Sequence, residues 1–314
     1  MTSRRILILL IAVAILALLI TFLIPNLFGA EPATYPGQFW RANTPEEQGL
    51  DSGKLADGLL AMQAQGTKID GLLVIRRGAL ILEAYFYPFQ AGHLHDLASV
   101  TKSFTTTLVG IAIDQGKLKL DDKLLSFFPD RQIANRDARK EAITIEHLVS
   151  MRNGFESGCL EGDPPTLAKM SAAPDWVQWA LDRPMVAEPG TQNCYDSPGM
   201  HLLSAILQQV TGQTEAEFAR QNLFEPLGIS EFYWAADPQG STRGWGELHL
   251  KPADMARLGY LWLQGGQWEG RQVVSEQWVK DSVAYHSDFG DGDGYGYGWW
   301  LWEGGFQASG RGGQ

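Results

Sequence analysis

A serine and a lysine three residues apart are the first side chains in this sequence that could do chemistry together. They stand in the stretch Ser99-Val100-Thr101-Lys102, the only place in the chain where lysine follows serine by three positions. On a helix these two positions share one face, so the hydroxyl could meet the amine as a nucleophile meets a base. At a helix N-terminus, Ser99 would also lie among free N–H groups that stabilise an oxyanion. The alternative is an ordinary N-cap serine followed by a solvated lysine, and the pair alone favours that alternative.

Signatures of other hydrolases and of metal or phosphate sites are missing from the sequence. No serine has glycine at both the −2 and the +2 position, which excludes the nucleophile elbow of α/β-hydrolases. His93-Leu94-His95-Asp96 begins like a dinuclear zinc motif, but Leu97 and Ala98 follow, so we interpret these histidines as structural. The sequence also has no H-E-x-x-H motif and no G-K-[ST] phosphate loop. We therefore expect neither a metal nor another cofactor.

Three stretches, read in order, resemble a known family. The first is HDLASVTKSFTTTLVGIAIDQGKLKLDD around Ser99, the second is NCYDSPGMHLLSAILQQVTG with Tyr195-Asp196-Ser197, and the third is FQASGRGGQ at the end of the sequence. With the PLGI at 226–229 and a predicted hairpin before Ser99, they resemble the serine beta-lactamase and penicillin-binding-protein-like superfamily. The similarity is to the class C-related branch that contains 6-aminohexanoate-dimer hydrolases and esterases, and it runs from about Thr44 to the last residue.

The resemblance implies roles for several side chains. Ser99 would be the nucleophile that forms an acyl-enzyme, and Lys102 and Tyr195 together would take its proton. Tyr195 would then protonate the leaving group. The backbone N–H groups of Ser99 and Arg311 would hold the oxyanion, with Gly310 and Ser197 beside the substrate.

Two positions depart from the family pattern. Ser197 stands where class C beta-lactamases have asparagine, and it also has a structural explanation as the N-cap of a helix that begins at Pro198. Ser309-Gly310-Arg311-Gly312 stands where lactamases have Lys-Thr-Gly. The lysine and the hydroxyl that the family pattern places opposite a beta-lactam carboxylate are therefore replaced. Arg311 could supply a charge or could equally face solvent.

These residues favour a serine hydrolase that cleaves a small-molecule amide or ester. A beta-lactamase or D-alanyl-D-alanine carboxypeptidase of the same fold is one alternative. A non-catalytic penicillin-type binding or sensor module is another, and the intact Ser99, Lys102 and Tyr195 argue against it. A nucleic-acid partner is excluded by the charge balance, because 36 acidic against 25 basic residues leave a net charge of −11.

Hydrophobic periodicity predicts the elements that must position these residues. Helices are expected at 51–65, 99–115, 144–151, 174–182, 198–211, 214–224 and 252–264, and strands at 72–75, 80–87, 296–302 and 306–309. This order predicts an α+β fold, with an antiparallel sheet from both chain ends flanked by helices and a mostly helical lobe inserted at about 121–250. Relatives continue past the third motif with two strands and a C-terminal helix. We expect these elements to be missing here, and the chain as written to fold poorly.

The first 29 residues predict a membrane anchor. The run from Ile6 to Ile24 is apolar apart from Thr21, and as a helix it would be roughly 28 Å long, close to the thickness of a bilayer core. Because Arg4 and Arg5 precede this run, the N-terminus is expected in the cytoplasm. A linker at 30–49 would then lead to a periplasmic hydrolase domain at 50–314. A cleaved signal peptide is the alternative, but its apolar region is usually shorter.

The two cysteines of the chain are Cys159 and Cys194. Outside the cytoplasm they could form a disulfide. The alternative is that both are buried free thiols, and the sequence favours neither interpretation.

Overall fold

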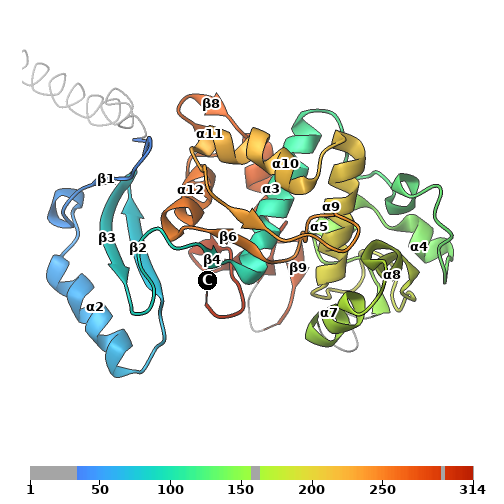
Figure 1. Ribbon diagram of the computed structural model, residues 1–314, viewed down its shortest axis with the longest axis horizontal. Helices are drawn as coiled ribbons and strands as arrows, with labels where there is room; N and C mark the ends of the chain where they lie inside the picture. Colours follow the sequence, from blue (N-terminus) through green and yellow to red (C-terminus); the bar gives the residue numbers. More distant parts are fainter. Residues whose placement is uncertain (1–33, 157–162, 291–293, 314) are drawn as a thin grey trace, which may run out of the picture.

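The computed structural model describes residues 34–156, 163–290 and 294–313 (Figure 1). Its helices are α2 (Ser52–Ala64), α3 (Thr101–Asp114), α4 (Ala138–Ala142), α5 (Ile145–Val149), α7 (Asp163–Ser171), α8 (Trp176–Asp182), α9 (Ser197–Thr211), α10 (Glu215–Ala219), α11 (Glu225–Leu227), α12 (Pro252–Leu263) and α13 (Glu276–Ser282). Shorter helical turns are η1 (Glu46–Gln48), η2 (Ala98–Val100), η3 (Leu124–Phe127) and η4 (Arg220–Phe224). The strands are β1 (Arg41–Ala42), β2 (Gly71–Arg76), β3 (Ala79–Tyr85), β4 (His95–Asp96), β5 (Tyr233–Trp234), β6 (Leu248–Leu250), β7 (Gln267–Trp268), β8 (Arg271–Gln272), β9 (Ser287–Asp288), β10 (Gly294–Tyr295), β11 (Trp300–Trp302) and β12 (Gly305–Gln307).

Small sheets from the two ends of the chain flank the helices, which confirms the predicted α+β class. The N-terminal sheet has the order β1-β3-β2, and the C-terminal sheet has the order β12-β11-β10-β9. The hairpin of β2 and β3 turns at Arg77 and Gly78, which both have positive φ. Within the described ranges these two sheets are separate, and β2 and β12 are each the last strand of their own sheet.

The strand predicted at 296–302 is wrong in its extent, because two glycines bend the chain there. A Cβ atom at Gly296 would lie 2.0 Å from the Ser282 carbonyl oxygen, and one at Gly298 would lie 2.4 Å from the Thr106 hydroxyl. This close approach between backbone and neighbours turns the chain between β10 and β11. The last predicted strand, 306–309, is observed as β12 at Gly305–Gln307.

Helix α3 forms the centre of the molecule and is buried on nearly every side. Its sequence has poor helix propensity, but its hydroxyl side chains are hydrogen-bonded to surrounding carbonyls. Ser103 donates to the Gly298 oxygen at 2.6 Å, and Thr105 donates to the Gly244 oxygen at 2.7 Å. Tertiary packing therefore holds this helix, as its composition predicts.

Residues 34–49, predicted to be a linker, contact helix α12. Trp40 is buried and its indole N–H donates to the Ala253 oxygen at 2.9 Å. Arg257, also buried, donates to the carbonyl oxygens of Gly37 and Gln38 at 3.0 Å each. These bonds attach the N-terminal sheet to the body through α12.

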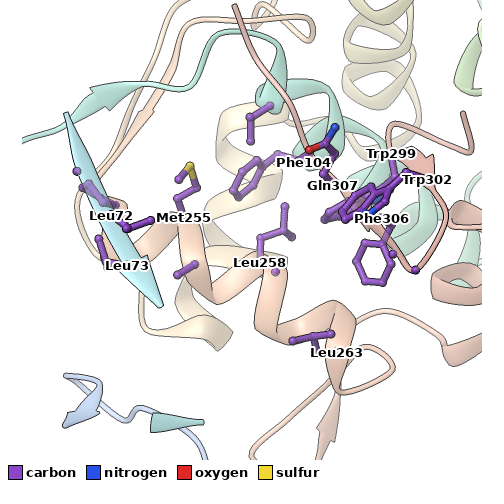
Figure 2. Close-up of a pocket in the computed structure, with 18 residues that line it drawn as sticks. Leu72, Leu73, Phe104, Met255, Leu258, Leu263, Trp299, Trp302, Phe306 and Gln307 are labelled. Atoms are coloured by element: carbon purple, nitrogen blue, oxygen red, sulfur yellow. The ribbon is translucent and has the colours of Figure 1, made fainter. Parts of the chain in front are cut away.

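An apolar groove of about 580 Å³ lies between the N-terminal and C-terminal sheets (Figure 2). Leu72 and Leu73 of β2 line one wall, and Trp299, Trp302 and Phe306 line the opposite wall. Side chains of α12, among them Met255 and Leu258, lie between these walls. The groove therefore separates the two edge strands β2 and β12.

The predicted membrane anchor at Ile6 to Ile24 lies outside the described residues. In the described part of the chain, no helix has the length and apolar character that crossing a membrane requires.

Candidate active site

Ser99 and Lys102 meet at the start of α3. Ser99 lies in the turn η2, which runs directly into the helix, so its hydroxyl is not on the α-helix that the sequence predicted. The Lys102 ammonium nevertheless donates to the Ser99 hydroxyl oxygen at 3.0 Å and to the Trp245 carbonyl oxygen at 2.9 Å. With only 1% of its surface exposed, Lys102 is not the solvated lysine of the alternative interpretation.

The backbone around Ser99 is held in an uncommon conformation. Ala98 has a φ of 43°, which a residue with a Cβ atom seldom adopts. The Asp96 carboxylate accepts a hydrogen bond from the Ala98 N–H at 2.9 Å, and the Leu97 N–H donates to the Leu248 oxygen at 2.8 Å. A neighbouring strand thus fixes the turn that presents the hydroxyl.

Gly310 packs directly against this turn. A Cβ atom there would lie 2.7 Å from the Leu97 carbonyl oxygen and 3.2 Å from the Ser99 backbone nitrogen. The backbone of the third motif therefore packs directly against the Ser99 turn, with no side chain between them.

Tyr195 faces Lys102 from the loop before α9. The Lys102 ammonium lies 4.7 Å from the centre of the Tyr195 ring, within the range of a cation–π contact. On its other side the ring stacks on Trp300 of β11, with centroids 5.8 Å apart and an interplanar angle of 19°. Burial between these neighbours fixes the orientation of the tyrosine.

The loop that carries Tyr195 ends at the cap of α9, and here the prediction that Ser197 is the N-cap is wrong. Asp196 is the cap, and its carboxylate accepts a hydrogen bond from the Gly199 N–H at 3.1 Å. The same carboxylate is paired with the buried guanidinium of Arg183, at 2.5 and 3.0 Å. Ser197 is instead the first helical residue, with 0% of its surface exposed.

A cavity of about 470 Å³ opens beside Ser99. It is lined by Asp96, Ala98, Ser99, Asp163, Pro164, Leu167, Tyr195, Trp245, Gly246, Glu247 and Arg311. The structure thus brings Ser99, Tyr195 and Arg311 to one cavity, with Lys102 buried behind it, whereas Ser197 and Gly310 are not among the lining residues. The described residues contain no cluster of three or more His, Cys, Asp or Glu side chains that could hold a metal ion.

Two further residues of the cavity wall, Asp163 and Trp245, were not predicted from the sequence. Asp163 begins α7, and its two carboxylate oxygens accept hydrogen bonds from the Ser197 N–H and hydroxyl, each at 2.8 Å. Burial raises the pKa of Asp163, while the positive charge of Lys102 and the bonds from Ser197 lower it. No motif marks either residue in the sequence. The one signal in the sequence is Trp245 itself, because a tryptophan beside a glycine could form the wall of a cavity.

Cys194 is buried and disulfide-bonded. Its predicted partner, Cys159, lies outside the described residues.

Comparison with known proteins identifies the family of this chain. Residues 59–314 match the beta-lactamase family. The lovastatin esterase of Penicillium rubens is 28% identical over 247 residues, which are 71% of this chain and 60% of that protein. The 6-aminohexanoate-dimer hydrolase of Paenarthrobacter ureafaciens is 24% identical, over 77% of this chain and 64% of its own length.

The fold is also similar to solved structures. That of EstCE1, a hydrolase with promiscuous acyltransferase activity, has a TM-score of 0.63 at 20% identity and covers 79% of this chain and 84% of its own. The chain spans less than two thirds of the length of the two curated relatives. Because the family match extends over most of the sequence, the chain belongs to the beta-lactamase family.

Proposed function

We propose that the protein is a serine hydrolase that cleaves a small amide or ester through an acyl-enzyme on Ser99. The observation that carries this proposal is the 3.0 Å hydrogen bond between the buried Lys102 ammonium and the Ser99 hydroxyl. A buried lysine has little reason to contact a serine at a cavity unless the pair has a function, because burial of a charge is costly.

The reaction requires Lys102 as the neutral amine. The Ser99 oxygen attacks the substrate carbonyl carbon, and its proton passes into the relay of Lys102 and Tyr195. The negative charge that develops on the carbonyl oxygen lies at the backbone N–H groups of Ser99 and Arg311. As the carbon–oxygen or carbon–nitrogen bond breaks, Tyr195 returns the proton to the leaving group. Water then attacks the acyl-enzyme, releases the acid and restores the Ser99 hydroxyl.

The cavity supports a small substrate with an apolar acyl part. Its volume of about 470 Å³ falls within the range of small-molecule sites. Pro164, Leu167 and Trp245 supply apolar surface beside Ser99. The two curated relatives are named as an esterase of lovastatin and a hydrolase of a 6-aminohexanoate dimer, which supports hydrolysis of a small molecule.

A labelling experiment tests the proposal. Purified protein is treated with a fluorescent fluorophosphonate or with a fluorescent penicillin, and the adduct is mapped by mass spectrometry, with Ser99→Ala as the control. A fluorophosphonate adduct on Ser99, with turnover of p-nitrophenyl butyrate, supports the hydrolase. A stable penicillin adduct without ester turnover supports the beta-lactam-binding alternative, and no adduct with either probe contradicts both.

We also propose that Ile6 to Ile24 anchors the protein in the membrane, with the hydrolase domain on the periplasmic side. The length and apolar character of this run support the anchor. The protein should then stay in the membrane fraction through a high-salt wash. A soluble product that begins near Glu31 would instead show cleavage.

A further inference from the structure

We propose that Trp245 determines how large an acyl group fits beside Ser99, and that His201, held by Asp237, keeps the Trp245 indole in place. This proposal rests on the proposed function and adds to it a specificity-determining residue and a positioning residue. It derives from the hydrogen bonds that fix the Trp245 segment and from the buried rings that pack against its indole.

The backbone of residues 242–245 is fixed by side chains from three elements of the fold. Each of the four carbonyl oxygens in this segment accepts a hydrogen bond from a side chain. The donors are Ser204 of α9 to Thr242 at 2.6 Å, Trp234 of β5 to Arg243 at 3.0 Å, Thr105 of α3 to Gly244 at 2.7 Å, and Lys102 of α3 to Trp245 at 2.9 Å. The segment connects β5 to β6, and these bonds satisfy its carbonyls in place of a strand neighbour. The backbone of Trp245 therefore has a fixed position relative to Lys102.

The Trp245 indole is packed against two other buried rings. Its ring centroid lies 5.5 Å from that of Trp176 and 5.1 Å from that of His201, which meets it edge to face at 87°. Trp245 lines the cavity beside Ser99, whereas Trp176 and His201 are not among the lining residues. A smaller side chain at position 245 would therefore extend the cavity toward these two rings.

A buried hydrogen bond fixes the His201 ring. Its Nε2 lies 3.0 Å from Oδ2 of Asp237, and because Nδ1 has no partner among the described residues, the ring proton belongs on Nε2. Oδ1 of the same carboxylate accepts hydrogen bonds from the N–H groups of Gln239 and Ser241, at 2.9 and 2.8 Å. Asp237 is thus held in the turn that leads into the Trp245 segment. Loss of the His201 donor would leave the ring, and the indole packed against it, free to shift.

The consequence is selectivity for the length of the acyl chain. One methylene that does or does not fit an apolar pocket changes kcat/KM by roughly tenfold or more. A smaller side chain at position 245 should therefore favour long acyl chains over short ones. The substitution keeps the backbone carbonyl of residue 245, so the hydrogen bond from Lys102 is retained.

The experiment compares kcat/KM for p-nitrophenyl hexanoate and p-nitrophenyl acetate, which share a leaving group and differ only in the acyl chain. The ratio of the two values does not depend on the concentration of folded enzyme, so a loss of stability alone leaves it unchanged. We expect Trp245→Ala to raise the hexanoate-to-acetate ratio by at least about tenfold. Trp268→Ala is the matched control, because Trp268 is also buried among aromatic rings but does not line this cavity. Its ratio should equal that of the wild type.

Two variants of His201 test the positioning role. His201→Leu loses the donor to Asp237 and should raise the hexanoate-to-acetate ratio by about threefold, as expected from the loss of one hydrogen bond. His201→Gln can donate to Asp237 from its side-chain amide, and its ratio should stay within about twofold of the wild-type value. Equal shifts in the two variants would overturn the positioning role, because the hydrogen bond would then have no effect on the indole.

An unchanged ratio in Trp245→Ala, even with lower activity toward both esters, would overturn the proposal. If that variant does not fold by circular dichroism, Trp245→Phe provides the same test with a smaller change in volume. Failure of the proposed function is a distinguishable result, because it would appear as turnover retained by Ser99→Ala.

Discussion

The two sides of helix α3 differ in how they are built. On one side lies the cavity beside Ser99. There Lys102 donates hydrogen bonds to Ser99 and to the Trp245 carbonyl and lies over the Tyr195 ring, and Asp163 of α7 accepts hydrogen bonds from Ser197. On the other side lies the groove lined by Val100 and Phe104, where Gln307 is the one labelled lining side chain with an amide among apolar and aromatic ones (Figure 2). The first side should determine activity, and the second should determine stability.

The largest effect is expected at Ser99. Ser99→Ala removes only the nucleophile from a partly exposed turn, so it should abolish ester turnover by at least about a thousandfold while the melting temperature stays within a few degrees. Steady-state kinetics and circular dichroism measure the two quantities. Turnover that survives in the purified variant would remove Ser99 from the mechanism.

Lys102→Met and Tyr195→Phe come next. Each removes a group from the proton relay, and each should lower kcat by at least roughly a hundredfold. Lys280→Met, which loses an exposed lysine of α13, is the matched control for the lost charge and should retain normal activity. Rates near that of the wild type in either relay variant would assign the proton transfer to other groups.

Substitutions in the groove should have the opposite effect, with a change in stability and little change in activity. Leu258 and Leu263 both lie on α12 and both line the groove, but Leu258 is buried whereas Leu263 is 67% exposed. Leu258→Ala should lower the free energy of unfolding by about 2–5 kcal/mol and change kcat/KM by less than about threefold. Leu263→Ala should change either quantity little. Urea denaturation measures the stability difference. Equal losses in the two variants would show that burial of the side chain does not determine its contribution to stability on this side of α3.

A pH-dependent effect on stability is expected at Glu215, behind the site. Burial raises the pKa of this carboxyl to about 7, and the hydroxyls of Ser204 and Thr105 act in the opposite direction. Below the pKa that this carboxyl has in the unfolded chain, it is protonated in both states and does not change the stability. As pH rises from there through 7, the unfolded state ionises more readily than the folded state, so the free energy of unfolding decreases. The loss should reach up to about 3 kcal/mol by pH 8.

Glu215→Gln cannot ionise, so it should be free of this loss. Urea denaturation of both proteins at pH 5 and pH 8 measures it, with Glu303→Gln as the exposed control. The same pH dependence in the wild type and in Glu215→Gln would place the ionisation elsewhere.

The sequence predicted local features better than long-range ones. The spacing of Ser99 and Lys102 is a local property, and the hydrogen bond between them forms even though Ser99 lies in η2 rather than in α3. A serine before a proline predicts the cap of α9 at Ser197, but aspartate is an equally good cap residue, and Asp196 takes that position. Arg183 pairs with that aspartate and stabilises it there.

Residues that come together from distant segments could not be predicted. Asp163 is 34 positions from Ser197, and the Trp245 carbonyl is 143 positions from Lys102. Neither belongs to a motif, and a backbone carbonyl leaves no trace in residue types. The contact of Trp40 with α12 was also missed, although a tryptophan in a supposed linker could have signalled burial.

The bare backbone of Gly310 limits how this protein could be evolved toward other substrates. A hydroxyl or an amine cannot be introduced at that position in one step, because the first atom of any side chain would collide with the Leu97 carbonyl. A selection experiment that seeks such a group would first have to accept a variant in which the third motif has moved away from the nucleophile. The exposed neighbour Arg311 carries no such penalty. Adaptive change in this motif should therefore accumulate at position 311, while position 310 stays glycine.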